Sequence, residues 1–200
     1  MENRVEWRIS GGSASCTGAR GWYAMLSEGA RHPPLGEWLA RIIGSWLQGE
    51  TVLPAALGLG DEAFRALMRF HFPGVVLPRN MLKSRPPADP GRQAEREILF
   101  DLLREHGSLA APEADWLAGI VAEGCLGEDH LWQDLGLWSR KDLSDLLFYG
   151  FAPLARRNTG DMKWKKFFYK QLCDAASLRL CQAPSCGVCR DYERCFGPEE

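Results

Sequence analysis

The stretch "LGEWLARIIGSWLQG", residues 35–49, carries its large apolar side chains at the spacing of a helix. They recur three or four positions apart, at Trp38, Leu39, Ile42, Ile43 and Trp46. This period places them on one side of an α-helix, where they can pack against other helices. The stretch therefore predicts an amphipathic helix in a helical core.

The same period continues along the chain, and no strand alternation of useful length interrupts it. "SRPPADPGR", residues 84–92, is rich in Pro and Gly and is typical of a linker. We therefore predict an all-α fold, a helical domain with an irregular Cys-rich C-terminal metal-cluster module. The expected helices span about 61–72, 93–106, 112–123, 139–151 and 161–177. We expect Asp61 to be the N-cap of the first of these and Pro112 to lie in the first turn of the third. Ser139 and Asp142 have the spacing of a capping box at the start of the fourth. The expected organisation is an N-terminal extension that is mobile (1–35), the helical domain (36–175) and a Cys-rich cluster-binding segment (176–200).

Composition limits the class of protein. Charged residues make up 25% of the 200 residues and the net charge is −2, so no global attraction to nucleic acid is expected. No apolar run is long enough to span a bilayer, and the N-terminus lacks the apolar stretch of a signal peptide. We expect a cytoplasmic protein that binds no membrane. In that compartment, clustered cysteines favour metal ligation over disulfides.

The C-terminal stretch "CQAPSCGVCRDYERCF", residues 181–196, holds four of the seven cysteines. Cys181, Cys186, Cys189 and Cys195 follow the spacing C-x4-C-x2-C-x5-C. Four thiolates can close a tetrahedral zinc site, although zinc sites usually pair two short knuckles separated by a longer stretch. A C-x4-C-x2-C run followed by a further Cys is also a known iron–sulfur spacing. The spacing favours an iron–sulfur cluster and leaves zinc open.

The segments around these cysteines resemble the NifQ family of nitrogen-fixation proteins. The resemblance rests on "MKWKKFFYKQLC" (162–173), on Cys181 and on "APSCGVCRDYERCFG" (183–197). "HLWQDLGL" (130–137) and "HFPG" (71–74) are also similar to that family. The specific match covers about residues 126–197, and the four-cysteine pattern shows no departure from the family's.

The resemblance implies an iron–sulfur protein whose cluster can include molybdenum. Such a protein supplies molybdenum for assembly of the nitrogenase iron–molybdenum cofactor, so its partners are the cofactor assembly proteins and a molybdenum source such as molybdate. We expect a carrier and not an enzyme, because the sequence shows no nucleophile–base pair, phosphate loop or dinucleotide fingerprint. Two alternatives stay open: a redox iron–sulfur protein without molybdenum, and a zinc-stapled interaction module.

Three further residues are candidate auxiliary groups. Cys173 lies eight positions before Cys181, off the apolar face of its helix. His71 lies on the apolar face of its helix and is either a core residue or an imidazole ligand. His130 follows Asp129, which could orient the imidazole near a metal, and the alternative is a residue at a helix start.

Lysines alternate with aromatic residues just before the Cys-rich segment. Trp164, Phe167 and Phe168 share one side of the expected helix 161–177 and predict its apolar face. Lys163, Lys166 and Lys170 share the opposite side. A solvated face of an amphipathic helix explains them, and a positive field that attracts molybdate or stabilises an anionic cluster is the functional alternative. A nucleic-acid surface is disfavoured because the rest of the chain is not basic.

Overall fold

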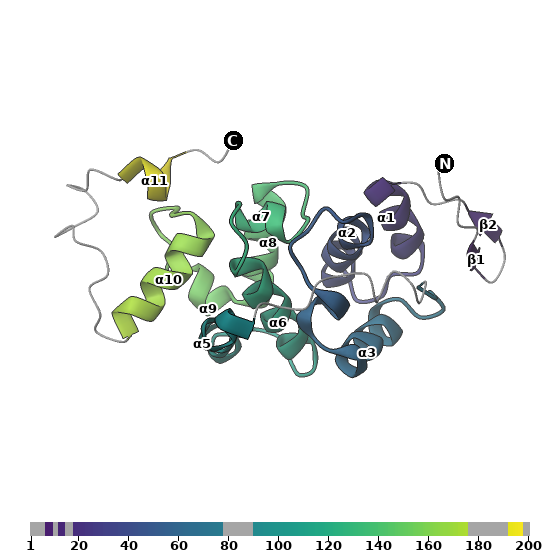
Figure 1. Ribbon diagram of the computed structural model, residues 1–200, viewed down its shortest axis with the longest axis horizontal. Helices are drawn as coiled ribbons and strands as arrows, with labels where there is room; N and C mark the ends of the chain where they lie inside the picture. Colours follow the sequence, from purple (N-terminus) through teal and green to yellow (C-terminus); the bar gives the residue numbers. More distant parts are fainter. Residues whose placement is uncertain (1–6, 10–11, 15–17, 78–89, 176–191, 198–200) are drawn as a thin grey trace.

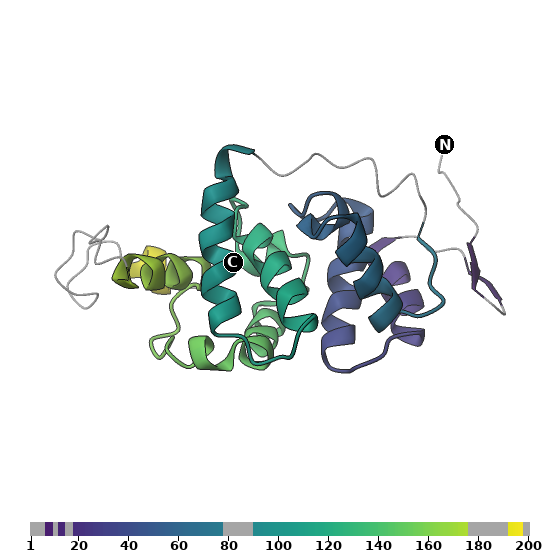
Figure 2. The same ribbon diagram turned by 90° about the horizontal axis from the view of Figure 1, so that it is seen from below.

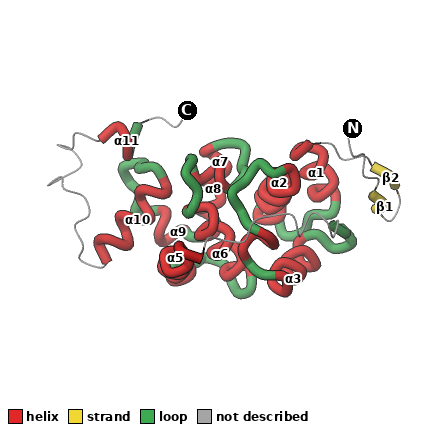
Figure 3. The backbone as a smooth tube through the Cα atoms, viewed as in Figure 1, coloured by secondary structure: helices red, strands yellow, loops and turns green. Residues whose placement is uncertain are grey.

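The computed structural model of the 200-residue chain describes residues 7–9, 12–14, 18–77, 90–175 and 192–197. The described part is helical apart from a short antiparallel hairpin of β1 (Trp7–Ile9) and β2 (Gly12–Ala14) (Figure 3). Two short stretches are 3-10 helices, η1 (Ala55–Gly58) and η2 (Pro90–Arg92). The α-helices are α1 (Gly18–Glu28), α2 (Leu35–Gln48), α3 (Asp61–His71), α5 (Gln93–Glu105), α6 (Glu113–Cys125), α7 (Leu131–Asp134), α8 (Arg140–Gly150), α9 (Ala152–Ala155), α10 (Trp164–Ala175) and α11 (Tyr192–Phe196).

The helices form an elongated body with its two ends made by different parts of the chain (Figure 1). Helices α1, α2 and α3 lie at one end, α6, α7 and α8 in the middle, and α10 with α11 at the other end. The view from below shows the same order, with α5 and α6 between α3 and α10 (Figure 2). Among the described residues, no helix is long and apolar enough to cross a membrane.

One hydrophobic core runs through this body from α1 to α10. Its largest fully buried side chains include Trp22, Trp46, Phe72, Phe151 and Phe168. Helix α6 lies at the centre, and 11 of its 13 residues are buried. Helices α3, α5 and α7 pack directly against α6, whereas α1 packs on α2 and α10 packs on α5.

The helices predicted from the sequence are present with small shifts at their ends. Helix α5 ends at Glu105, one residue before the predicted end, and Ser139 caps α8 as predicted by accepting a hydrogen bond from the Asp142 backbone N–H at 3.1 Å. Asp61 is the first helical residue of α3 and not its N-cap, which is Gly60. Pro112 precedes α6 and does not lie in its first turn.

The helical core begins earlier than the sequence predicted. Helix α1 lies within residues 1–35, which the sequence analysis assigned to an N-terminal extension. Its residues Trp22, Met25 and Leu26 are buried in the core, and α1 packs along α2. The three side chains recur at helical spacing but lie within residues 22–26, so their apolar pattern is too short to predict the helix.

Candidate metal centre

Helix α10 leads into the Cys-rich segment, and its apolar face is the one predicted from the sequence. Trp164, Phe167 and Phe168 are buried, and their rings pack 5.8 to 6.0 Å apart between centroids. The indole Nε1 of Trp164 donates a hydrogen bond to the Ser144 hydroxyl of α8 at 3.1 Å. This aromatic face fixes α10 on the helical body.

A second attachment of α10 is a buried ion pair that the sequence pattern did not predict. The Lys165 ammonium binds the Asp134 carboxylate of α7 and also donates to the Gly127 carbonyl at 2.9 Å. The Asp134 side chain is 1% exposed. Burial raises the pKa of Asp134, and the bond from Lys165 offsets part of that shift. Lys165 therefore ties α10 to α7 through a charge that water does not reach.

A third attachment joins α10 to the start of α5. The Tyr169 hydroxyl donates a hydrogen bond to the Glu95 carboxylate, which Arg92 also binds at 2.7 Å. The bond from Arg92 lowers the pKa of Glu95, whereas burial raises the pKa of Tyr169. Three separate contacts thus hold α10, which makes it a rigid base for the segment that follows.

Of the four predicted ligands, Cys195 is the one that the described residues contain. It lies in α11, and its backbone carbonyl accepts a hydrogen bond of 2.8 Å from the backbone N–H of Lys163, just before α10. Its thiol is free and the residue is half-buried against the core. A free thiol of this kind suits a soft metal or an iron–sulfur centre. Cys181, Cys186 and Cys189 lie outside the described residues.

The other thiols differ in their surroundings. Cys173 lies on α10, half-buried and free, so it stays a candidate auxiliary ligand. Cys125 is buried in the core, and burial raises the pKa of its thiol to about 12. A thiol must lose its proton to bind a metal, so Cys125 is a poor ligand. Within the described ranges, no group of three or more His, Cys, Asp or Glu side chains could hold a metal ion.

The three lysines of the predicted positive face lie on α10 or directly before it. Lys166 and Lys170 are exposed and Lys163 is half-buried. Lys170 pairs with Asp174 one turn later, so part of the positive charge is compensated on the helix itself. Arg194 of α11 is exposed and adds positive charge near Cys195. The arrangement fits both the solvated face and the local positive field.

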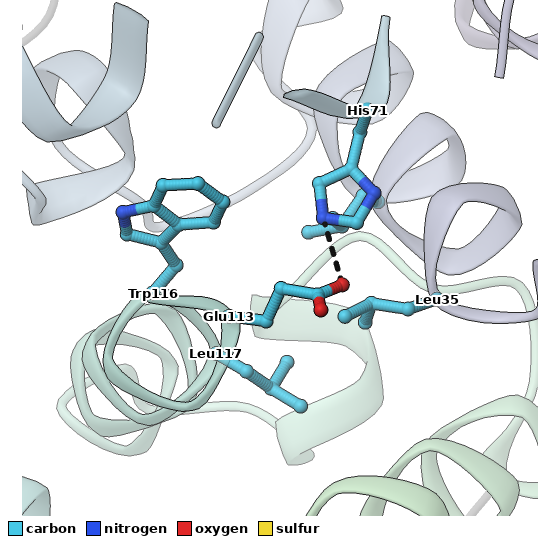
Figure 4. A pocket seen from close by; sticks show the side chains of 6 residues that line it. Leu35, His71, Glu113, Trp116 and Leu117 are labelled. Atoms are coloured by element: carbon cyan, nitrogen blue, oxygen red, sulfur yellow. Dashed lines mark ion pairs between the residues drawn. The ribbon is translucent and has the colours of Figure 1, made fainter. Parts of the chain in front are cut away.

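His71 does not lie near α11. It belongs to α3, at the other end of the body, with α5 and α6 between α3 and α10 (Figures 1 and 2). The ring is fully buried, its Nδ1 is 3.4 Å from the Arg31 carbonyl, and its Nε2 faces the Glu113 carboxylate at 3.4 Å (Figure 4). Burial lowers the pKa of His71. These contacts describe a core histidine that joins α3 to α6.

His130 stands at the start of a helix. It is the N-cap residue of α7, and its backbone N–H donates a hydrogen bond to the Gln133 side chain at 3.2 Å. The helix-start interpretation therefore accounts for its position. Asp129 contributes to the electrostatic environment of Asp134, where its negative charge raises the pKa of that carboxyl group.

The contact between His71 and Glu113 yields a testable prediction. The bond to the Arg31 carbonyl requires a proton on Nδ1, which leaves Nε2 as a buried acceptor facing a carboxylate oxygen with no hydrogen bond. In Glu113→Gln the amide can donate to Nε2. An unsatisfied buried group costs about 1–3 kcal/mol, so we expect the thermal midpoint to rise by about 2–6 °C at pH 7.5.

The matched control for this change is Glu62→Gln, which removes a carboxylate from the first turn of α3. Both changes weaken a favourable charge at a helix N-terminus, and only one supplies a donor to the buried ring. A midpoint for Glu113→Gln that is no higher than that of the control would contradict the interpretation. In the wild type, the lowered pKa of His71 means that stability falls as the pH drops below 6.5, because the unfolded chain then takes up a proton more readily.

Comparison with known proteins connects these features to a family. The NifQ family model matches residues 38–197, which include all four cysteines of the C-terminal cluster. Protein NifQ of Azotobacter vinelandii is 42% identical over 171 residues, covering 81% of this chain and 88% of that protein. Protein NifQ of Rhodobacter capsulatus is 39% identical over 165 residues (82% and 89%), and that of Klebsiella pneumoniae is 35% identical over 171 residues (82% and 99%). No solved structure matches the chain.

Proposed function

Because the chain belongs to the NifQ family, which is involved in nitrogen fixation, we propose that it is an iron–sulfur carrier that binds molybdenum and donates it for assembly of the nitrogenase iron–molybdenum cofactor. The observation that carries the proposal is the family match across residues 38–197. It includes the complete C-x4-C-x2-C-x5-C pattern together with the helix that precedes it.

The proposed ligands are Cys181, Cys186, Cys189 and Cys195. When bound, an iron–sulfur cluster supplies soft sulfide ligands and a metal corner that molybdenum can occupy. The chain's own residues hold the ends of the ligand segment: α10 fixes the start, and the bond from Lys163 to Cys195 fixes the end. The exposed cations Lys166, Lys170 and Arg194 offer a positive field for an anionic cluster or molybdate.

The protein acts in this proposal as a carrier, with no turnover chemistry beyond receiving and releasing metal. Its partners are the cytoplasmic assembly proteins of the nitrogenase cofactor, and molybdate is the source of the cargo. A carrier must release what it binds, so one ligand is expected to be less firmly bound than the others. The proposal includes no nucleic acid and no membrane.

Metal content is the measurement that tests the function. The full chain is purified without oxygen, and iron, zinc, molybdenum and acid-labile sulfide are counted per chain. We expect iron and sulfide in comparable amounts, no stoichiometric zinc, and molybdenum taken up when molybdate and a reductant are added. The paramagnetic resonance spectrum should change on uptake of molybdenum.

Each of the other outcomes would favour one of the two alternative functions. Iron and sulfide with reversible one-electron chemistry and no uptake of molybdenum would favour the redox iron–sulfur alternative. Stoichiometric zinc with no sulfide would favour the zinc-stapled module and overturn both cluster functions. The Cys125→Ala variant serves as the matched control, because it removes a buried thiol that is a poor ligand and should leave all four counts unchanged.

A further inference from the structure

The loop that receives α11 is fixed by its own hydrogen bonds. The Asn158 side chain donates to the Met162 carbonyl at 2.8 Å and accepts from the Met162 backbone N–H at 2.9 Å. Arg140 of α8 binds both the carbonyl and the carboxylate of Asp161, at 3.1 and 3.0 Å. Met162 is buried in the core. The loop 158–163 is therefore a preformed platform beside the start of α10.

Helix α11 is docked on this platform. The Lys163 backbone N–H donates to the Cys195 carbonyl at 2.8 Å. The Phe196 ring packs against the core and stacks on Tyr192, with 4.5 Å between the ring centroids. A Cβ added to Gly160 would come within 3.2 Å of the Phe196 ring, so the platform and the ring are close neighbours. Figure 1 shows α11 beside the start of α10.

A helix of five residues cannot be stable in water by itself, because it is too short to offset the cost of its first turn. The contacts with the platform must hold it. Tyr192 is 46% exposed, whereas Phe196 is partly buried against the core. Phe196 is therefore the side chain of α11 that contributes most of the apolar contact.

We propose that Phe196 is a positioning residue that docks α11 on the 158–163 platform and holds the Cys195 thiol on the folded body before any metal is bound. This inference rests on the proposed function in one respect, namely that Cys195 is a ligand. A ligand that is already ordered loses less conformational entropy on binding than one that must be ordered. Cys195 is then the ligand that stays bound throughout. The thiol that dissociates when the metal is released is one of the other three proposed ligands, Cys181, Cys186 and Cys189.

Thiol labelling of the metal-free, reduced full chain tests the docking without any cluster. Mass spectrometry follows the alkylation of Cys195, with Cys173 as the internal reference. In Phe196→Ala, which keeps every cysteine, we expect Cys195 to react about tenfold faster than in the wild type, because one packed aromatic ring is lost. Phe196→Leu keeps an apolar side chain and should recover most of the protection. Equal rates in wild type and Phe196→Ala would overturn the inference.

The second readout is the rate at which a chelator removes iron from the reconstituted protein. Iron should leave Phe196→Ala several times faster than the wild type, and Cys173 labelling should stay unchanged. Gly160→Val keeps Phe196 and every thiol but crowds the Phe196 ring. It should therefore also speed up both the labelling of Cys195 and the release of iron. The control is Phe70→Ala, which removes an aromatic stack of 4.2 Å on His32 at the other end of the body and should change neither.

The two readouts separate the inference from the proposed function. Fast labelling in Phe196→Ala in a protein that binds no iron would support the docking and contradict the carrier function. Unchanged labelling in a protein that binds iron and molybdenum would contradict the docking and leave the carrier function intact. Iron release that is equal in Phe196→Ala and Phe70→Ala would show that Phe196 has no positioning role.

Discussion

Replacing Lys165 with methionine is expected to lower the thermal unfolding midpoint by about 10 °C at pH 7.5. The Asp134 carboxylate is 1% exposed, and in this variant it would lose the cation that it binds. Removing one partner of a buried pair costs about 3–5 kcal/mol, because the other charge stays buried without compensation. Methionine has nearly the length of lysine, so little of the loss comes from a cavity.

The size of this effect should depend on pH. Burial already raises the pKa of Asp134, and loss of Lys165 raises it further. Asp134 therefore takes up a proton in the variant as the pH falls, and a neutral carboxyl group is less costly to bury. The difference in midpoint between wild type and Lys165→Met should narrow on acidification, as far as both proteins stay folded.

Lys170→Met is the matched control on the same helix. Its partner Asp174 lies one turn away, and the two side chains are 45% and 57% exposed. Exposed pairs of this kind contribute about 0.5 kcal/mol or less, so the midpoint should move by about 1 °C. Calorimetry of both variants measures the two shifts. Similar shifts at Lys165 and Lys170 would show that the buried pair with Asp134 stabilises the fold no more than an exposed pair does.

The second large effect is expected at the cysteines. Under the proposed function, separate alanine substitutions of Cys181, Cys186, Cys189 and Cys195 should divide into two groups. Three of them, including Cys195, should lose most of the bound iron. The remaining one should keep iron and fail to retain molybdenum, because a carrier needs one ligand that can leave. Iron and molybdenum counts after anaerobic reconstitution measure both effects.

Two other cysteines serve as references for this series. Cys125→Ala should lose about 1 kcal/mol of stability and no metal, since its thiol is buried and its pKa is about 12. Cys173→Ala tests whether the thiol on α10 assists in loading. Equal losses of iron and molybdenum in all four ligand variants would contradict the idea of one weakly held ligand.

The helical fold could be predicted from periodicity because the long helices carry clear apolar faces. Trp164, Phe167 and Phe168 are an example, since their spacing alone placed them on the buried side of α10. Helix α1 was not predicted, because its three buried residues lie within residues 22–26 and form less than two turns of pattern. Its place in the core depends on α2, and a local pattern does not contain that information.

The same reasoning explains why Lys165 was missed. In a run of lysines, its charge resembles that of its solvated neighbours, and its partner Asp134 is 31 residues away. The pair can be recognised only when the packing of α7 against α10 is known. Likewise, the spacing of the cysteines predicts four ligands, but the docking of Cys195 arises from the platform at 158–163, which is a tertiary contact.

The hydrogen bond from Lys163 to Cys195 closes a loop in the chain. Helix α10 ends at Ala175, and Cys195 of α11 is anchored beside the first residue of α10. In a flexible chain, closing a loop of 16 residues, the number between α10 and α11, costs about 2.5 kcal/mol of chain entropy beyond a constant term. The contacts of α11 offset that cost during folding, so a ligand that binds the Cys195 thiol does not have to provide it.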